Sequence, residues 1–201
     1  QEDLLALVSK PSRYLGGEVN SIRKDPGSCS VRIALAFPDT YEVGMSHLGL
    51  QILYAILNGY PDVAAERCYA PWPDMEKVLR THGLALTTLE SRTPLSAFDL
   101  VGFSLQYELS YTNVLNMLEL GGIPLRCSER SQDAPLVIAG GPCTFNPAPM
   151  APFIDAFVIG EGEEVISEIA AALRQAKAGK YDRNRRLEQL ASIPGIYVPT
   201  H

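Results

Sequence analysis

The run Val31–Phe37 is apolar except for Arg32 and is bounded on both sides by residues typical of turns. Such a run indicates a strand that is buried on both faces of a sheet. From Ser46 onward apolar residues recur at helical spacing, and the pattern stops at Asn58-Gly59, a usual helix end. A buried strand, a loop and a helix in this order form the first unit of a parallel α/β sheet.

The same alternation continues through most of the chain. Further strands are predicted at 63–69, 84–89, 98–105, 136–139 and 156–159, and further helices at 74–82, 111–120 and 163–178. Because parallel strands need crossover connections, the pattern predicts an α/β fold with a doubly wound parallel sheet. Residues 25–180 are predicted to form this domain, residues 1–24 a lead-in segment, and residues 181–201 a linker.

Composition excludes several classes of protein. The 201 residues carry a formal charge of −6, whereas a general nucleic-acid-binding surface needs a basic excess. The one basic cluster, residues 174–186, is interpreted either as a solvated helix end or as a contact for RNA or a protein partner. No apolar run is long enough to span a bilayer and no secretory signal is present, so we expect a cytoplasmic protein without a membrane partner.

The four cysteines are too far apart in the sequence for a zinc ribbon or a Cys-x-x-Cys redox pair, and they are interpreted as reduced, mostly buried thiols: Cys29, Cys68, Cys127 and Cys143.

Candidate binding residues follow the predicted strands, whose carboxyl ends converge at one edge of such a sheet. They are Asp39, Tyr41, Glu42, Gly44 and His47 after the first strand, Ser104, Gln106 and Tyr107 after the middle one, and then Gly140, Gly141, Gly160, Glu161 and Gly162. The glycine loops for phosphates and dinucleotides are absent, which disfavours nucleotide binding. Backbone without side chains can approach a large planar ligand closely, although the glycines could equally serve tight turns alone.

Three of these loops resemble the parts of the cobalamin-binding fold. Asp39-x-Tyr41-x-x-Gly44 is similar to Asp-x-His-x-x-Gly, Ser104-x-Gln106 to Ser-x-Leu, and Gly140-Gly141 to Gly-Gly. Over most of its length the sequence resembles the amino-terminal domain of a radical S-adenosylmethionine (SAM) protein family of unknown function. The stretches that carry this likeness are 10–18, 38–46, 70–76, 102–108, 139–143 and 160–164.

The resemblance implies a flavodoxin-like, cobalamin-binding-like Rossmann architecture and an accessory function. Members of that family continue into a barrel with a Cys-x-x-x-Cys-x-x-Cys motif, which this chain lacks. The 4Fe–4S cluster and S-adenosylmethionine are therefore expected only in a separate catalytic barrel, which would be the partner of this domain beyond the linker. No catalytic residue is predicted in the chain itself.

The resemblance also makes cobalamin a candidate cofactor, held either with no protein ligand to cobalt or through a substitute for the usual histidine. Tyr41 replaces the ligand histidine, and a tyrosine would have to lose a proton whose pKa is about 10. His47 is the nearest substitute, and it is interpreted either as a helix cap or as a cobalt ligand.

Two other functions stay open. One is a degenerate docking or substrate-recognition domain, with RNA as one partner, whose groove would be filled by Tyr41, Tyr107 and Trp72. The other is an independent small-molecule enzyme, for which no acid, base or nucleophile converges. The oligomeric state is not predicted.

Overall fold

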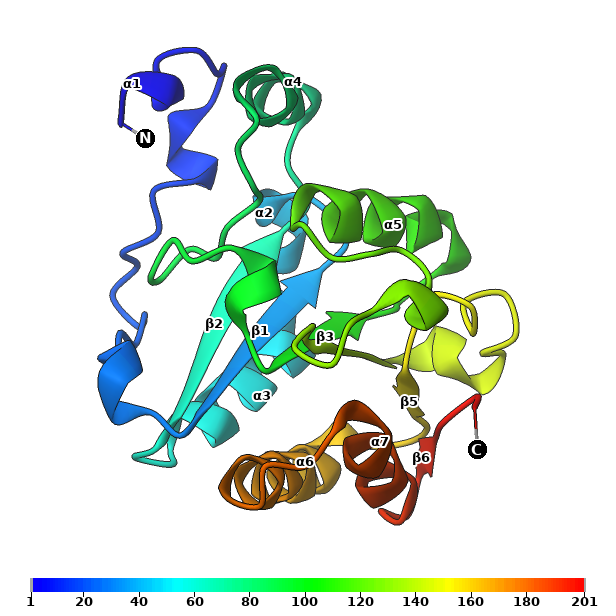
Figure 1. The fold of residues 1–201 in the computed structure, drawn as a ribbon. Coiled ribbons are helices and arrows are strands. Elements are labelled where there is room, and N and C mark those ends of the chain that lie inside the picture. The colour runs from blue at the N-terminus through cyan, green and yellow to red at the C-terminus, as the bar shows by residue number, and fades with distance from the viewer. Residues whose placement is uncertain (1, 201) are drawn as a thin grey trace.

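The computed structural model describes residues 2–200, which form a six-stranded sheet in the order β2-β1-β3-β4-β5-β6 (Figure 1). The first five strands are parallel, and the sixth is antiparallel to β5. Their bounds are β1 Val31–Phe37, β2 Val63–Tyr69, β3 Leu100–Ser104, β4 Leu136–Gly140, β5 Ala156–Val158 and β6 Ile196–Tyr197. The predicted α/β fold with a mostly parallel sheet is confirmed.

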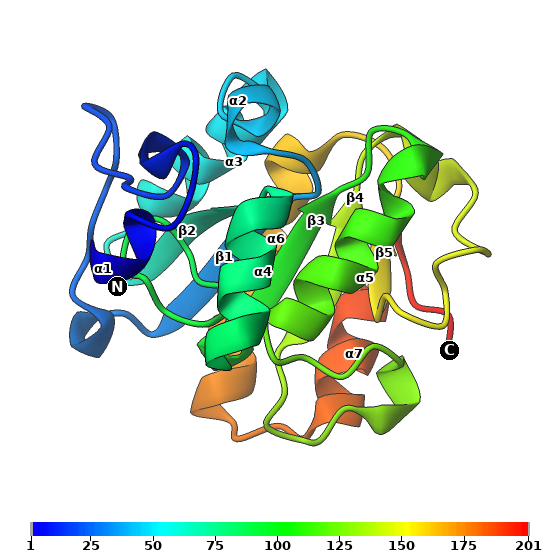
Figure 2. The same ribbon diagram turned by 90° about the horizontal axis from the view of Figure 1, so that it is seen from above.

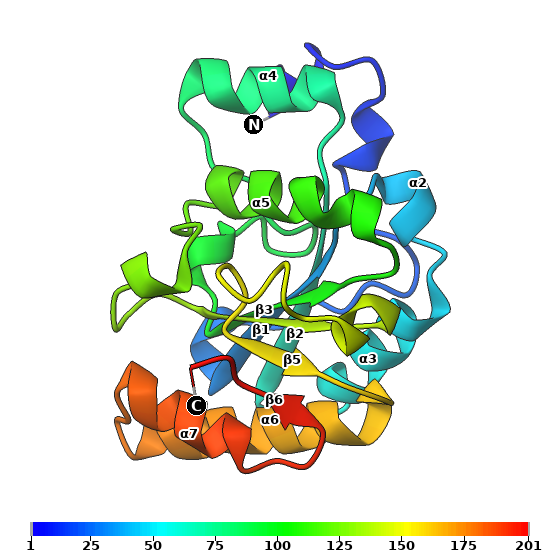
Figure 3. The same cartoon turned by 90° about the vertical axis from the view of Figure 1, so that its right-hand side faces the viewer.

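Helices cover both faces of the sheet. Figure 3 shows α4 and α5 on one face and α3, α6 and α7 on the other. Side chains of α4 and α5 contact each other directly, as Arg80 donates to Asn116 and Glu119, and Figure 2 shows the two helices side by side. The helices are α1 Glu2–Leu5, α2 Tyr41–Gly44, α3 Leu48–Asn58, α4 Pro73–His82, α5 Tyr111–Leu120, α6 Gly162–Ala178 and α7 Arg183–Ala191.

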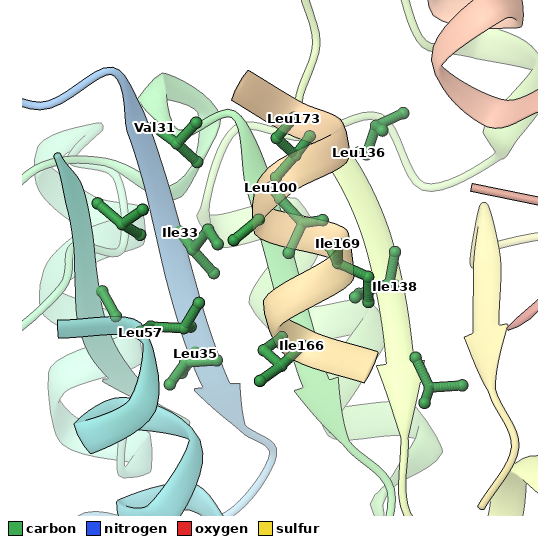
Figure 4. Close-up of a cluster of buried hydrophobic side chains, with 14 of the residues drawn as sticks. Val31, Ile33, Leu35, Leu57, Leu100, Leu136, Ile138, Ile166, Ile169 and Leu173 are labelled. Atoms are coloured by element: carbon green, nitrogen blue, oxygen red, sulfur yellow. The ribbon is translucent and has the colours of Figure 1, made fainter. Parts of the chain in front are cut away.

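The core is divided by the sheet into two apolar layers. Ile33 and Leu35 of β1 belong to the layer under α3 and α6, whereas Ala34 and Ala36 belong to the layer under α4 and α5. This two-sided burial explains why β1 is apolar apart from Arg32. Figure 4 shows the first layer, in which residues of α6 lie over β1, β3 and β4: Ile166, Ile169 and Leu173.

One predicted strand is wrong. Residues 84–89 form no ladder, only an isolated bridge between Thr87 and Pro94. They lie beside the outer edge of β2, where the Leu89 N–H donates to the Arg67 carbonyl at 2.8 Å. Leu86 and Leu89 are buried, which explains the strand-like apolar pattern without a strand.

Backbone groups on the outer edge of β2 form hydrogen bonds with side chains instead of with another strand. The Asn58 side chain bonds both the N–H and the carbonyl of Ala65, at 3.1 and 3.0 Å. The Arg67 N–H donates to Glu90 Oε2 at 2.7 Å, and Lys24 Nζ donates to the Val63 carbonyl at 2.6 Å. Backbone groups that an edge strand normally exposes are therefore satisfied within the chain.

Residues 181–201, predicted as a linker, contribute α7 and β6 to the domain as far as they are described. Arg183 at the start of α7 is buried and donates to Asp155 Oδ2 at 2.6 Å. Arg130 donates to the same oxygen at 2.8 Å. This triad ties α7 to the amino end of β5, and a connection to a further domain stays a prediction.

Among the helices within residues 2–200, none combines the length and the apolar character that crossing a membrane requires.

Candidate functional site

A groove opens between α3 and α6 above the carboxyl halves of β3 and β4. Its volume, including the open mouth, is about 870 Å³. Most of the side chains that line it are aliphatic: Leu35, Leu50, Leu53, Leu100, Ile138, Val158, Ile166 and Ile169. The polar side chains of the lining are His47, Ser104, Gln106, Glu161 and Glu163. An apolar cleft with a few polar groups at the switch region of an α/β sheet is the usual form of a ligand site.

Three glycines widen this groove because they carry no side chain. A Cβ atom at Gly140 would meet only Val158 Cβ, at 3.9 Å, and one at Gly160 would meet nothing within 4 Å. A Cβ at Gly162 would approach Leu53 no closer than 3.5 Å. The missing side chains therefore form a cradle that a flat group could occupy.

The backbone itself favours glycine at Gly141 and Gly160, because their φ angles are +106° and +110°. A Cβ at Gly141 would in addition lie 2.7 Å from the Leu105 carbonyl oxygen. In the pair Gly140-Gly141, the first residue leaves the groove open and the second is required by the tight turn.

Ser104 and Gln106 form a polar pair in the groove. Gln106 Nε2 donates to Ser104 Oγ at 2.8 Å. Because this bond uses the serine oxygen as an acceptor, the serine O–H can donate to a bound molecule.

His47 lines the groove and caps α3. Its Nδ1 accepts from the Leu50 N–H at 3.1 Å, and its ring centroid lies 5.0 Å from that of Phe37. An accepting Nδ1 places the imidazole proton on Nε2, so Nε2–H is a donor. Ligation of cobalt through Nε2 would require the Nε2 lone pair, and the ring proton would then lie on Nδ1. A protonated Nδ1 cannot accept from the Leu50 N–H, so the cap would be lost. The geometry supports the cap interpretation of His47.

We expect His47→Ala to lower the free energy of unfolding by about 0.5–2 kcal/mol, because the substitution removes an N-cap acceptor. Urea denaturation measures this loss. His47→Asn is the matched control, since asparagine caps well and should retain most of the stability. Equal losses for the two variants would contradict the capping role.

Four predicted site residues have partners away from the groove lining. Tyr107 Oη donates to Asp39 Oδ2 at 2.9 Å. Tyr41 Oη donates to Glu18 Oε1 at 2.8 Å, and Glu42 accepts from Lys10 and Arg13 at 2.7 and 2.8 Å. None of the four lines the groove as described. They tie together the loops at the carboxyl edge of the sheet, and a ligand-binding role for them stays a prediction.

The electrostatics of Tyr41 disfavour cobalt ligation. Partial burial and the Glu18 carboxylate both raise the pKa of Tyr41. Glu18 is held in place by Arg67, whose Nη2 donates to Glu18 Oε2 at 2.8 Å. The phenol is therefore kept protonated and engaged.

Sequence reasoning missed these partners because they come from the lead-in segment. Glu18, Lys10 and Arg13 reach the loop after β1, while Arg13 stacks 4.7 Å from the Trp72 ring. The only available signal was the stretch 10–18, which carried the family resemblance but suggested no contact.

Gly44 is buried against two aromatic rings. A Cβ there would lie 2.5 Å from Tyr69 Cδ1 and 2.9 Å from Phe37 Cδ1. The loop motif thus needs glycine for packing.

We expect Gly44→Ala to lower the free energy of unfolding by about 1–3 kcal/mol, the usual range for overpacking. Chemical denaturation would measure the change. Gly27→Ala serves as control because its Cβ would meet only the Asp25 side chain at ordinary contact distance, 3.5 Å or more. Gly44→Ala matching that control would show that the rings move aside freely.

The residues present do not fit an iron–sulfur cluster. Among the side chains that the structure describes, no three of His, Cys, Asp or Glu gather in a way that could hold a metal ion. Cys68 and Cys143 are buried, and burial raises the pKa of Cys127 to about 12.

Comparison with known proteins decides the family. The model of radical SAM proteins, N-terminal, matches residues 49–199, which is more than half of the chain. The chain belongs to this family. The matched range of this radical SAM N-terminal domain includes the groove residues of β3, β4 and α6 but not the loop 39–47. The predicted radical SAM relationship is confirmed, while a cobalamin-binding character stays a prediction.

A curated relative of this radical SAM N-terminal domain is an uncharacterised protein of Methanocaldococcus jannaschii. It is 26% identical over 140 residues, which cover 68% of this chain and 26% of the relative. The chain thus spans about a quarter of the length of that relative. No solved structure matches the chain.

Proposed function

We propose that this chain is the accessory N-terminal domain of a radical SAM protein and that its groove binds cobalamin. The observation that carries the proposal is the glycine cradle, where Gly140, Gly160 and Gly162 leave room for a flat group beside aliphatic walls. The strand order 2-1-3-4-5 supports it, because it is the order of flavodoxin-like sheets, which bind flat cofactors at this edge.

In this proposal the protein holds cobalamin without a ligand to cobalt. The backbone at Gly140 approaches the flat group, the Ser104 O–H and His47 Nε2–H donate to its polar atoms, and the aliphatic walls exclude water. Bound cobalamin would supply its cobalt centre to the chemistry of the whole protein.

The test is a titration of the 201-residue chain with hydroxocobalamin, followed by visible absorbance and calorimetry. We expect saturable binding of one molecule per chain. His47→Ala should give the same visible spectrum as the unmodified chain, because the imidazole does not ligate cobalt. The absence of binding at concentrations well above micromolar would refute the proposal, and an altered spectrum for His47→Ala would refute the arrangement without a ligand.

A second candidate function is docking, favoured by apolar side chains exposed in the loops at the carboxyl edge of the sheet. They follow the carboxyl ends of β1 to β4 and include Leu48, Leu109 and Phe145, which are 67%, 86% and 75% exposed. A gathering of exposed apolar groups at one edge is typical of an interaction surface. The partner in this proposal is the catalytic domain of the whole protein.

Hydrogen exchange would test docking. Backbone amides of residues 107–110 should exchange more slowly in a longer protein that includes a catalytic domain than in this chain. Equal exchange rates would count against docking at this edge. The groove-filling side chains expected of a degenerate domain, Tyr41, Tyr107 and Trp72, do not line the groove.

RNA recognition gains no comparable support. Within residues 174–186, Arg174 pairs with Asp62, Lys177 with Asp99 and Arg183 with buried Asp155. These contacts neutralise half of the basic cluster inside the chain.

A further inference from the structure

A second pocket lies on the face of the sheet opposite the groove, between the N-terminal helix α1, helix α4 and residues 84–92. Its volume, including the open space at its mouth, is about 590 Å³. Most of its lining is aliphatic: Leu4, Leu5, Met75, Leu79, Leu84, Leu86 and Leu89. It is separate from the groove, since the two share no lining residue.

Arg92 is the only charged residue among those that line this pocket. It is half-buried, and among the side chains of residues 4–200 it makes no hydrogen bond, ion pair or cation–π contact. Its φ is +56°, in the left-handed region that residues other than glycine rarely adopt. Strained backbone of this kind is often retained where a residue has a binding role.

Two acids of the adjoining segments, Glu66 and Glu90, are already engaged by other groups. Glu66 accepts from the hydroxyls of Thr88 and Ser91, at 2.6 and 2.5 Å, and lies 3.5 Å from Arg32. Glu90 accepts from Arg67 at 2.7 Å. Neither of these two acids is therefore free to pair with the Arg92 guanidinium.

Three other half-buried arginines differ from Arg92 in this respect. Arg13, Arg67 and Arg174 each form an ion pair together with a cation–π contact. A planar guanidinium is suited to a carboxylate, which it can hold through two parallel hydrogen bonds. An aliphatic cavity with one such group calls for a ligand that is apolar apart from one carboxylate.

We propose that this pocket binds a small carboxylic acid with an apolar body, such as a medium-chain fatty acid. The carboxylate pairs with Arg92, and the apolar body lies among the leucines of α1, α4 and residues 84–89. The site is independent of the groove and of the function proposed for it.

Calorimetric titration of the 201-residue chain with sodium octanoate tests this proposal. Octan-1-ol and octylamine are matched probes with the same chain length and no negative charge. We expect octanoate to bind saturably and about 10- to 100-fold more tightly than either, the range given by a charge-assisted hydrogen-bond pair. Equal affinities for octanoate and octan-1-ol would overturn the role of the charge, and no octanoate binding would overturn the site.

Two substitutions at Arg92 and one control test whether octanoate binds in this pocket. Arg92→Gln should weaken octanoate binding by about 10- to 100-fold, whereas Arg23→Gln, which changes an exposed arginine outside the pocket, should leave it unchanged. Arg92→Gly should lose the same affinity while raising the melting temperature by about 2–4 °C, because glycine accepts the positive φ. A stable Arg92→Gly variant that still bound octanoate would disprove the assignment.

Saturating hydroxocobalamin should not change the octanoate affinity, because the two pockets lie on opposite faces. Loss of octanoate binding under that condition would place both ligands in the groove and overturn the separate site. Failure of cobalamin itself to bind would leave the octanoate measurement as it stands.

Discussion

Asp155→Ala is expected to lower the free energy of unfolding by about 3–5 kcal/mol, which is the usual cost of removing one partner from a buried ion pair. The Asp155 side chain is 2% exposed, and the Arg130 and Arg183 side chains that it bonds are 0% and 7% exposed. Its Oδ2 also accepts from the Val137 N–H at 2.7 Å. The alanine variant would leave two buried arginines without a counter-ion.

Guanidinium chloride denaturation measures this loss. Glu119→Ala is the matched control, because it removes one carboxylate from an exposed ion pair with Arg80 and should cost no more than about 1 kcal/mol. Asp155→Asn, which keeps one oxygen acceptor, should fall between the two. If the alanine variants at 155 and 119 were equally stable, the triad would not hold α7 in place.

Gly140→Val is expected to weaken hydroxocobalamin binding by about 100-fold or more, a difference of about 2.8 kcal/mol. A valine side chain would enter the open space beside Val158 that the flat group needs. The fold should survive, because Gly140 ends strand β4, its φ is not positive, and valine suits a strand.

Visible absorbance titration measures the affinity, and thermal unfolding verifies the fold. Gly140→Ala provides a graded comparison, since a single methyl group fills less of the space and should cost less affinity than valine. Unchanged affinity in a folded Gly140→Val variant would remove cobalamin from this part of the groove.

Much of the fold could be predicted because local pattern and burial agree. The run 31–37 is apolar because β1 is central and covered on both faces, and helix α6 shows its buried stripe and its acidic first turn directly. Residues 84–89 have the same kind of pattern for another reason, since they pack beside β2 without pairing. Helix α7 is hard to predict because its first residue, Arg183, is buried by a partner 28 residues away in sequence.

The candidate site was predictable only in the part that topology fixes. The rule that loops converge at the carboxyl ends of parallel strands brings Ser104, Gly140, Gly160 and Glu161 to one groove. The same rule could not show which way a side chain turns. Tyr41 and Glu42 are directed by Glu18 and Arg13, contacts that depend on how residues before the sheet fold back over it.

The way β2 is closed also bears on how the protein behaves at high concentration. An open edge of a sheet invites strands of other molecules to add to it, which leads to polymerisation or aggregation. Here Asn58, Lys24 and Glu90 occupy the hydrogen-bonding positions that an incoming strand would need. At the β2 edge, crowding in a cell should therefore produce neither fibres nor strand-swapped dimers of this protein.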